Sequence, residues 1–177
     1  MKTSQIDKRL KQVKLIISDV DGILTDGTIL IGDGIELKQF TVEDGAGAAL
    51  SRMAGIPVAL ISGRYSKSTE IRAKEMKIEH CYQGSLDKLT PLSQICKFYG
   101  LVPNQVAYIG DGWIDIPVME KVGVPITVPN AHPLVKEAAI YETKNSGGEG
   151  VLREVVEWIL EGQGRYLQVL NEFFLII

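Results

Sequence analysis

Short apolar runs alternate with helix-like stretches along most of the chain. Apolar runs of about four to eight residues between turn residues are typical of buried strands, and longer stretches with capping residues are typical of helices. Their alternation predicts a mostly parallel sheet with right-handed crossovers. We expect strands at residues 13–19, 57–61, 79–83, 106–109 and 125–128, an edge strand at 139–141, and helices at 1–12, 44–55, 66–76, 86–99, 132–137 and 151–160.

The segment after the first predicted strand does not fit this alternation. Residues 28–31 and 35–38 are both β-prone, and Gly32-Asp33-Gly34 lies between them. An Asp-Gly turn between two such runs is a strong signal for a hairpin. We therefore expect a β-hairpin insertion at about residues 23–42. Isoleucine and leucine occur on both of its strands, which favours an interface with another subunit over a surface decoration.

The length and composition are those of one globular domain, which we assign to residues 1–177. Apolar residues make up 45% of the chain and charged residues 23%. A chain of this size can bury roughly 70% of its unfolded surface, enough for a substantial core. The formal net charge is −3, and lysine and arginine are scattered. Bulk electrostatics therefore give no reason to expect a nucleic-acid partner.

The sequence predicts neither a membrane segment nor a disulfide framework. No apolar run approaches the roughly 20 residues needed to span a bilayer, and residues 1–14 are charged. Cys81 and Cys96 fit no zinc or redox spacing, so we expect two reduced thiols. His80 and His132 likewise fit no metal-ligand spacing. We expect a cytoplasmic protein without a membrane partner.

Polar residues follow three of the predicted strands. The carboxyl ends of parallel strands meet at one edge of the sheet, where open α/β sheets bind ligands. Residues far apart in the sequence can therefore meet there. These residues are Asp19 and Asp21 after the first strand, Ser62, Gly63 and Arg64 after the second, Asp111 and Asp115 after the strand at 106–109, and Lys88 at the start of a helix.

These groups match the parts that phosphoryl transfer to a carboxylate requires. Asp19 is the candidate nucleophile, and Asp21 is the candidate general acid and base. Because carboxylate and phosphate repel each other, the reaction needs a hard divalent cation held by oxygens. The carboxylates of Asp19 and Asp111 and the backbone carbonyl of Asp21 can supply such oxygens for Mg²⁺. Asp115, one turn further on, would support this metal site from behind its ligands.

The non-transferred phosphate oxygens need hydrogen-bond donors. The Ser62 hydroxyl, the backbone N–H groups around Gly63 and the Lys88 ammonium are the candidates. Taken singly, the site residues have simpler interpretations: a turn for the paired acids, a helix cap for Ser62 or Asp115, and a solvated side chain for Lys88. Arg64 and Arg72 could equally be surface ion-pair partners. The presence of four motifs in order favours catalysis.

The ordered motifs resemble those of the haloacid dehalogenase phosphatase superfamily over about residues 13–130. They stand here as Asp19-Val20-Asp21-Gly22, Ser62, Lys88 and Gly110-Asp111-Gly112-Trp113-Ile114-Asp115. A closer resemblance, over nearly the whole chain, is to the 3-deoxy-D-manno-octulosonate 8-phosphate (KDO 8-phosphate) phosphatases. It rests on residues 19–27, Lys38-Gln39-Phe40, Asp44-Gly45-Ala46-Gly47 and residues 147–154.

The resemblance implies a Rossmann-like α/β fold with helices on both faces of the sheet and no cap domain. It implies Mg²⁺-dependent hydrolysis of a sugar-acid phosphomonoester through an aspartyl-phosphate at Asp19, in lipopolysaccharide biosynthesis. It also implies a homotetramer, in which the hairpins form a central barrel and cover neighbouring sites, and a tail at 162–177 that can reach an adjacent site. Arg64, Arg72 and Thr25 are the expected substrate contacts.

Several alternatives remain open. The phosphatase of nine-carbon sialic-type sugar acids carries Glu at the position of Arg64, so Arg64 favours the octulosonate, whose carboxylate needs a cationic partner. Other rivals are a phosphatase for a different sugar phosphate, a non-catalytic oligomerisation module and a phospho-acceptor domain. The intact Asp19 and Asp21 argue against the last two. Many relatives have a second aspartate where this chain has Gly112, so outer support for the metal could be weaker.

Overall fold

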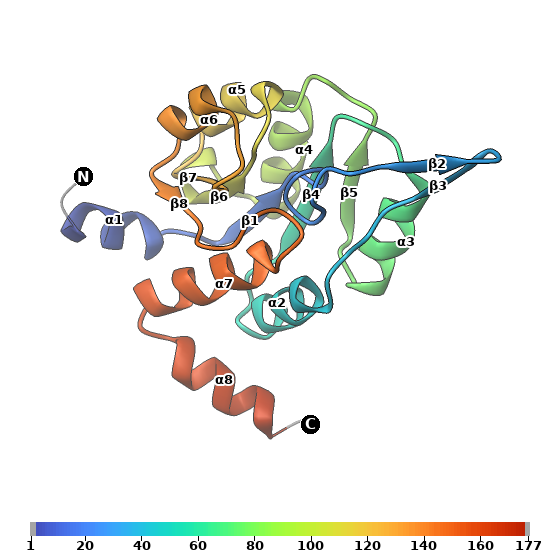
Figure 1. The fold of residues 1–177 in the computed structure, drawn as a ribbon. Coiled ribbons are helices and arrows are strands. Elements are labelled where there is room, and N and C mark those ends of the chain that lie inside the picture. The colour runs from blue at the N-terminus through green and yellow to red at the C-terminus, as the bar shows by residue number, and fades with distance from the viewer. Residues whose placement is uncertain (1–2, 176–177) are drawn as a thin grey trace.

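The computed structural model describes residues 3–175 and has an α/β architecture (Figure 1). Its strands are β1 (Leu15–Ser18), β2 (Leu30–Gly32), β3 (Ile35–Leu37), β4 (Val58–Ser62), β5 (His80–Gln83), β6 (Val106–Ile109), β7 (Val124–Thr127) and β8 (Tyr141–Glu142). Its α-helices are α1 (Thr3–Leu10), α2 (Val42–Met53), α3 (Lys67–Glu75), α4 (Leu89–Tyr99), α5 (Ile116–Met119), α6 (Pro133–Ala138), α7 (Val151–Gly162) and α8 (Tyr166–Phe174).

Strand β1 lies inside a 6-stranded sheet with the order β5-β4-β1-β6-β7-β8. Every neighbouring pair in this sheet is parallel. All four residues of β1 are buried, which explains its unbroken run of Leu, Ile and Ile. Helices α2 and α7 lie on one side of the sheet, and α4, α5 and α6 lie on the other (Figure 1). The predicted fold class is confirmed.

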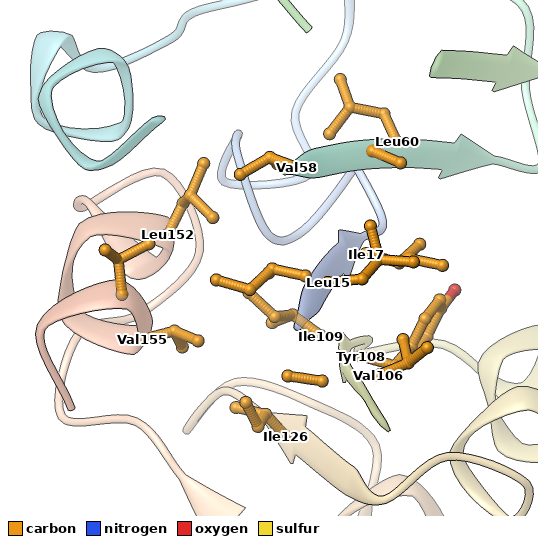
Figure 2. Packing of buried hydrophobic residues seen from close by; sticks show 14 of the residues in the cluster. Leu15, Ile17, Val58, Leu60, Val106, Tyr108, Ile109, Ile126, Leu152 and Val155 are labelled. Atoms are coloured by element: carbon orange, nitrogen blue, oxygen red, sulfur yellow. The ribbon is translucent and has the colours of Figure 1, made fainter. Parts of the chain in front are cut away.

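The hydrophobic core lies between the sheet and its helices. Figure 2 shows side chains from the central strands beside those of α7. Removing one aliphatic side chain of this kind from water stabilises the fold by roughly 1.5–3 kcal/mol. The core therefore fixes the central strands, and with them the sheet edge that carries the polar motifs. The labelled side chains, all buried, are Leu15, Ile17, Val58, Leu60, Val106, Tyr108, Ile109, Ile126, Leu152 and Val155.

The predicted hairpin is present as β2 and β3, an antiparallel pair outside the main sheet. Its turn is Asp33-Gly34, and both residues have positive φ angles, 50° and 76°. This is the backbone geometry that favours an Asp-Gly turn between twisted strands. The hairpin extends away from the body of the molecule (Figure 1). Its apolar side chains are exposed: Leu30, Ile31, Ile35 and Leu37.

Helix α2 begins differently from the prediction. Thr41 is its N-cap and accepts a hydrogen bond from the Glu43 N–H, so Asp44 is not the cap. Asp44 is instead buried in the first turn, where its Oδ1 accepts the backbone N–H of Leu152 in α7 at 2.9 Å. Gly47 lets the two helices approach closely, because a Cβ there would lie 2.6 Å from the Cα of Arg153.

The segment after α7 forms a helix, α8, which the sequence analysis did not predict. Arg165, which precedes α8, donates a hydrogen bond to the carbonyl of Ala54 at 2.7 Å. Val169 is buried, whereas Phe174 and Leu175 are exposed. The last two residues of the predicted tail, 176–177, lie outside the described part of the chain.

Smaller differences concern element ends. The first strand is shorter than predicted, the helix predicted at 86–99 begins at Leu89, and the edge strand lies at Tyr141–Glu142. Asp87 delays the start of α4, because its carboxylate accepts the N–H groups of Leu89 and Thr90. Cys81 and Cys96 are free thiols, as predicted. Among residues 3–175, no helix is long and apolar enough to cross a bilayer.

Candidate active site

Three adjacent strands bring the predicted motifs to one edge of the sheet. β1 pairs with β4 on one side and with β6 on the other, and all three run in the same direction. Asp19 follows the last residue of β1, Ser62 is the last residue of β4, and Asp111 lies two residues beyond β6. The topology therefore places these three motifs side by side at the carboxyl ends of the strands.

Lys88 is the positive centre of the site. Its Nζ lies 2.7 Å from Asp19 Oδ2 and 2.7 Å from Asp115 Oδ1. Its side chain is completely buried, so the interpretation as a solvated surface lysine is wrong. A buried ammonium is stable only when carboxylates compensate its charge. Lys88 therefore joins the start of α4 to the motifs after β1 and β6.

Asp115 holds the loop after β6 in shape. Its Oδ1 accepts the Lys88 ammonium and also the Tyr108 hydroxyl, at 2.5 Å. Its Oδ2 accepts the backbone N–H groups of Asp111 and Gly112, at 3.2 and 2.9 Å. With four donors already bound, Asp115 is suited to support the site rather than to bind a metal directly. Tyr108 was missed by the sequence analysis, because it lies within an apolar strand.

The buried carboxylates outnumber the buried ammonium. Oxygens of Asp19, Asp111 and Asp115 all lie within 4.8 Å of one another. Burial, together with the charge of Asp115, raises the pKa of Asp19 to about 8 and that of Asp111 to about 6. Although burial opposes it, the charges of Asp19 and Asp115 raise the pKa of Lys88.

This excess of negative charge fits a cation site. A hard divalent cation bound by carboxylate oxygens of Asp19 and Asp111 would restore neutrality, and oxygen ligands of this kind suit Mg²⁺. Asp19 and Asp111 are two of the three predicted metal ligands, and Asp115 is the third carboxylate of this group. The structure also places Gly22, with a φ of 86°, directly against Asp111, because a Cβ there would lie 2.1 Å from Asp111 Oδ2.

Asp21 has a partner that the sequence analysis did not identify. The Nζ of Lys38, one residue beyond β3, lies 2.6 Å from Asp21 Oδ1. The Lys38 side chain is completely buried, and that of Asp21 is 25% exposed. Lys38 Nζ also lies 3.4 Å from Thr69 Oγ1 in α3. The candidate acid–base residue is thus linked to the hairpin.

Ser62 and Gly63 form a tight turn after β4. The Ser62 hydroxyl donates to the carbonyl of Arg64 at 2.9 Å and accepts the Arg64 N–H at 3.3 Å. Gly63 packs closely against the 110–115 loop, because a Cβ there would lie 2.7 Å from Ile114 Cδ1. The turn therefore lies beside the loop that carries Asp111.

The three predicted substrate contacts have different surroundings. Arg64 is paired with Glu36 of the hairpin, and its side chain is 45% exposed. Arg72 donates to the carbonyl of Thr41 at 2.8 Å and pairs with Glu75. Thr25 is buried, and its Oγ1 accepts the N–H groups of Gly22 and Gly27, at 3.4 and 3.2 Å. Within this single chain, Arg64 is the most accessible of the three.

The segment at 147–150 supports the loop that follows Asp21. The N–H of Gly148 donates to the carbonyl of Ile23 at 2.9 Å. A Cβ at Gly147 would lie 2.0 Å from the carbonyl oxygen of Gly22. Only a residue without a side chain can pass so close to that backbone. This contact explains why glycine is needed in a segment far from the motifs in sequence.

A buried cluster of Asp19, Lys88 and Asp115 lies at the carboxyl edge of a parallel sheet. Asp21 follows Asp19 by two residues. These are the features of a haloacid dehalogenase-type hydrolase. The sequence model for haloacid dehalogenase-like hydrolases matches residues 61–155, and the chain belongs to this family.

Among the members of this family, the chain is similar to phosphatases of one sugar phosphate. The chain is 42% identical over 164 residues to the 3-deoxy-D-manno-octulosonate 8-phosphate phosphatase KdsC of Escherichia coli strain K12, covering 92% of this chain and 87% of that protein. The crystal structure of the Yersinia pestis phosphatase of the same name has a TM-score of 0.89 at 43% identity, covering 92% and 89% of the two chains. The Moraxella catarrhalis phosphatase, in complex with a magnesium ion, a phosphate ion and a KDO molecule, has a TM-score of 0.92 at 39% identity, covering 97% and 99%.

Proposed function

We propose that this protein is a Mg²⁺-dependent phosphatase that converts KDO 8-phosphate to KDO and inorganic phosphate in lipopolysaccharide biosynthesis. The observation that carries the proposal is the buried Asp19–Lys88–Asp115 cluster beside Asp111, in a chain that is 42% identical to a KDO 8-phosphate phosphatase over 92% of its length. The cluster supports the chemistry, and the relatives support the substrate.

The chemistry proceeds in two steps. A carboxylate oxygen of Asp19 attacks the phosphorus of the monoester, and the bond between phosphorus and the sugar oxygen breaks. Asp21 gives its proton to that departing oxygen. Asp21 then takes a proton from water, whose oxygen attacks the same phosphorus and releases phosphate from Asp19.

The remaining residues stabilise charge on the transferred group. Lys88, the Ser62 hydroxyl and the backbone N–H groups around Gly63 would bind the non-bridging oxygens. Asp19, Asp111 and the Asp21 carbonyl would hold Mg²⁺, which supplies further charge neutralisation between nucleophile and phosphate when bound. Asp115 keeps Lys88 and the 110–115 loop in position.

We assign recognition of the sugar carboxylate to Arg64, with Arg72 and Thr25 as further contacts. Arg64 directly follows the Ser62–Gly63 turn, and its guanidinium pairs with the carboxylate of Glu36 in the hairpin. A substrate carboxylate can replace Glu36 in this pairing, because a guanidinium binds either group in the same planar geometry.

We also propose that the protein works as a cytoplasmic homotetramer. The exposed leucines and isoleucines of the hairpin, and the exposed Phe174 and Leu175 of the tail, form apolar surfaces of the kind that subunits cover in an assembly. In this proposal, the hairpin of one subunit covers the site of a neighbour, and the tail from residue 162 can reach an adjacent site.

The test is a comparison of kcat/KM across sugar phosphates, with Mg²⁺ and after exhaustive chelation. The panel contains KDO 8-phosphate, N-acetylneuraminate 9-phosphate and a neutral hexose phosphate. We expect the highest value for KDO 8-phosphate and no turnover without the metal. A much higher value for the nine-carbon acid would move the substrate to that alternative, and a preference for the hexose phosphate would refute an acidic-sugar substrate.

A further inference from the structure

The hairpin contacts the candidate site within the same chain. Glu36 lies in β3 and Lys38 lies one residue beyond its end, and an extended segment places residues two apart on the same face. Both make ion pairs with candidate site residues: Glu36 with Arg64, and Lys38 with Asp21. Leu37, between them, points to the opposite face and is exposed.

The Lys38–Asp21 pair is the stronger of these two contacts. The Lys38 ammonium lies 2.6 Å from Asp21 Oδ1, and its side chain is completely buried. An ammonium removed from water needs a nearby opposite charge, and losing that charge costs several kcal/mol. Arg64 is 45% exposed, so solvent screens its pair with Glu36. Only the Lys38–Asp21 pair therefore restricts its carboxylate strongly.

We propose that Lys38 is a positioning residue, which holds the Asp21 carboxylate in the orientation required for general acid and base catalysis. Asp21 lies in the turn after β1, next to Gly22, whose φ is 86°. The buried ammonium holds the Asp21 carboxylate there, and Thr69 Oγ1 in α3 lies 3.4 Å from the same nitrogen.

This inference rests on the proposed phosphatase function and adds a link between the hairpin and the chemistry. General acid–base catalysis requires the carboxylate to lie within hydrogen-bond reach of the departing oxygen. If Lys38 sets that geometry, its removal will slow only the reactions that need a proton from Asp21. A loss of folding or metal binding would instead slow the transfer from every ester.

The experiment compares Lys38→Met and Lys38→Arg with wild type under single-turnover conditions with Mg²⁺. KDO 8-phosphate has an alkoxide leaving group that needs a proton, whereas p-nitrophenyl phosphate releases a stable phenolate. We expect Lys38→Met to lower the transfer rate from KDO 8-phosphate by roughly 10- to 100-fold and to leave that from p-nitrophenyl phosphate nearly unchanged. Lys38→Arg, which keeps the charge, is expected to recover part of the rate.

Combining Lys38→Met with Asp21→Asn tests whether Lys38 acts through Asp21. Because Lys38 acts through Asp21, Lys38→Met should have almost no further effect on the KDO 8-phosphate rate once Asp21 is Asn. Lys67→Met, which removes a lysine from an exposed pair on the adjacent α3, is the matched control and is expected to keep the wild-type rate. An equal loss for both esters, or a full additional loss in the Asn background, would overturn the proposal.

A separate measurement distinguishes failure of this inference from failure of the proposed function. Thermal unfolding of the two single variants and the double variant measures the coupling of Lys38 with Asp21 without any substrate. We expect the midpoint shift of the double variant to be smaller than the sum of the single shifts. Additive shifts would refute the pairing. Wild-type protein that hydrolyses neither ester would refute the phosphatase function while leaving a measured coupling intact.

Discussion

Asp19 has two opposing roles at the scale of single residues. Its pKa is raised to about 8, mainly by burial and also by the charge of the nearby Asp115. The ionised form of Asp19 is therefore unfavourable without a metal cation. The same ionised oxygen is the candidate nucleophile. The site therefore combines low intrinsic stability with reactivity, a common property of catalytic carboxylates.

Asp19→Asn separates these two roles. We expect it to abolish turnover, and to leave the melting temperature without metal equal to or above that of wild type, because one buried carboxylate has become neutral. Mg²⁺ should raise the melting temperature of wild type but not of the variant. Differential scanning calorimetry with and without Mg²⁺ measures both effects. Turnover by the variant, or an equal response to Mg²⁺, would contradict the assignment.

Lys88→Met should have the opposite effect on stability. It leaves Asp19 and Asp115 without their common ammonium, so we expect the free energy of unfolding to fall by about 3–5 kcal/mol at neutral pH without metal. Urea unfolding measures this loss, and Lys97→Met, an exposed position on the same helix, is the matched control. Equal stability of the two variants would show that Lys88 does not neutralise the cluster.

The residues that the structure brings together as Asp19, Lys88, Asp111 and Asp115 could be chosen from the sequence, because their types suit the proposed chemistry and the aspartates follow predicted strands. Lys38 and Tyr108 were missed for a physical reason. Each has an ordinary local context, a lysine after a strand and a tyrosine within one, and each gains its role only through a partner distant in sequence. Pairing of this kind depends on tertiary structure, which local patterns do not encode.

At the scale of elements, the contact between α2 and α7 contains a buried acid. Asp44 Oδ1 accepts the Leu152 N–H, whereas the buried Oδ2 has no hydrogen-bond partner among the described residues. Burial raises the pKa of Asp44 to about 7 from its usual 3.8. The folded state therefore favours the protonated form.

This raised pKa predicts how stability depends on pH. Between about pH 4 and 7 the unfolded chain ionises Asp44 before the folded protein does, so the contribution of Asp44 to folding falls as pH rises. Asp44→Asn keeps the acceptor for Leu152 but cannot ionise. We expect it to be more stable than wild type at pH 8, by up to roughly 4 kcal/mol, with the difference vanishing near pH 4. A constant difference in urea titrations would contradict the shifted pKa.

The sequence predicted most elements because apolar periodicity and turn residues are local signals. Asp33-Gly34 correctly marked the hairpin turn. The helix predicted to end at residue 99 does end there, because Gly100 terminates α4 with a φ of 64°. The start of α2 was misplaced, because Thr41 and Asp44 are both good capping residues and only the contact with α7 separates them. Helix α8 was missed because most of its side chains are not buried in this chain.

At the scale of the whole molecule, we expect the chemistry and the substrate specificity to depend on different parts of the assembly. The groups proposed to carry out phosphoryl transfer, Asp19, Asp21, Lys88 and Asp111, all come from one chain. The hairpin leaves its outer face uncovered, with Leu30, Ile35 and Leu37 at least 57% exposed. In the proposed assembly, a subunit that carries all of these groups but exposes this face would need a neighbour to enclose the substrate.

Charged substitutions on that outer face should therefore disrupt the assembly without removing the groups proposed for phosphoryl transfer. In Leu30→Asp/Ile35→Asp, burying the new carboxylates between subunits would cost several kcal/mol, so we expect a monomer by light scattering. Its kcat/KM for KDO 8-phosphate should fall at least tenfold, because the neighbouring hairpin no longer covers the sugar, while p-nitrophenyl phosphate hydrolysis persists. Val102→Asp, which charges an apolar residue of similar exposure elsewhere, should remain tetrameric and active. A monomeric wild type would refute the assembly, and undiminished sugar-phosphate turnover by the monomeric variant would place all of the specificity within one chain.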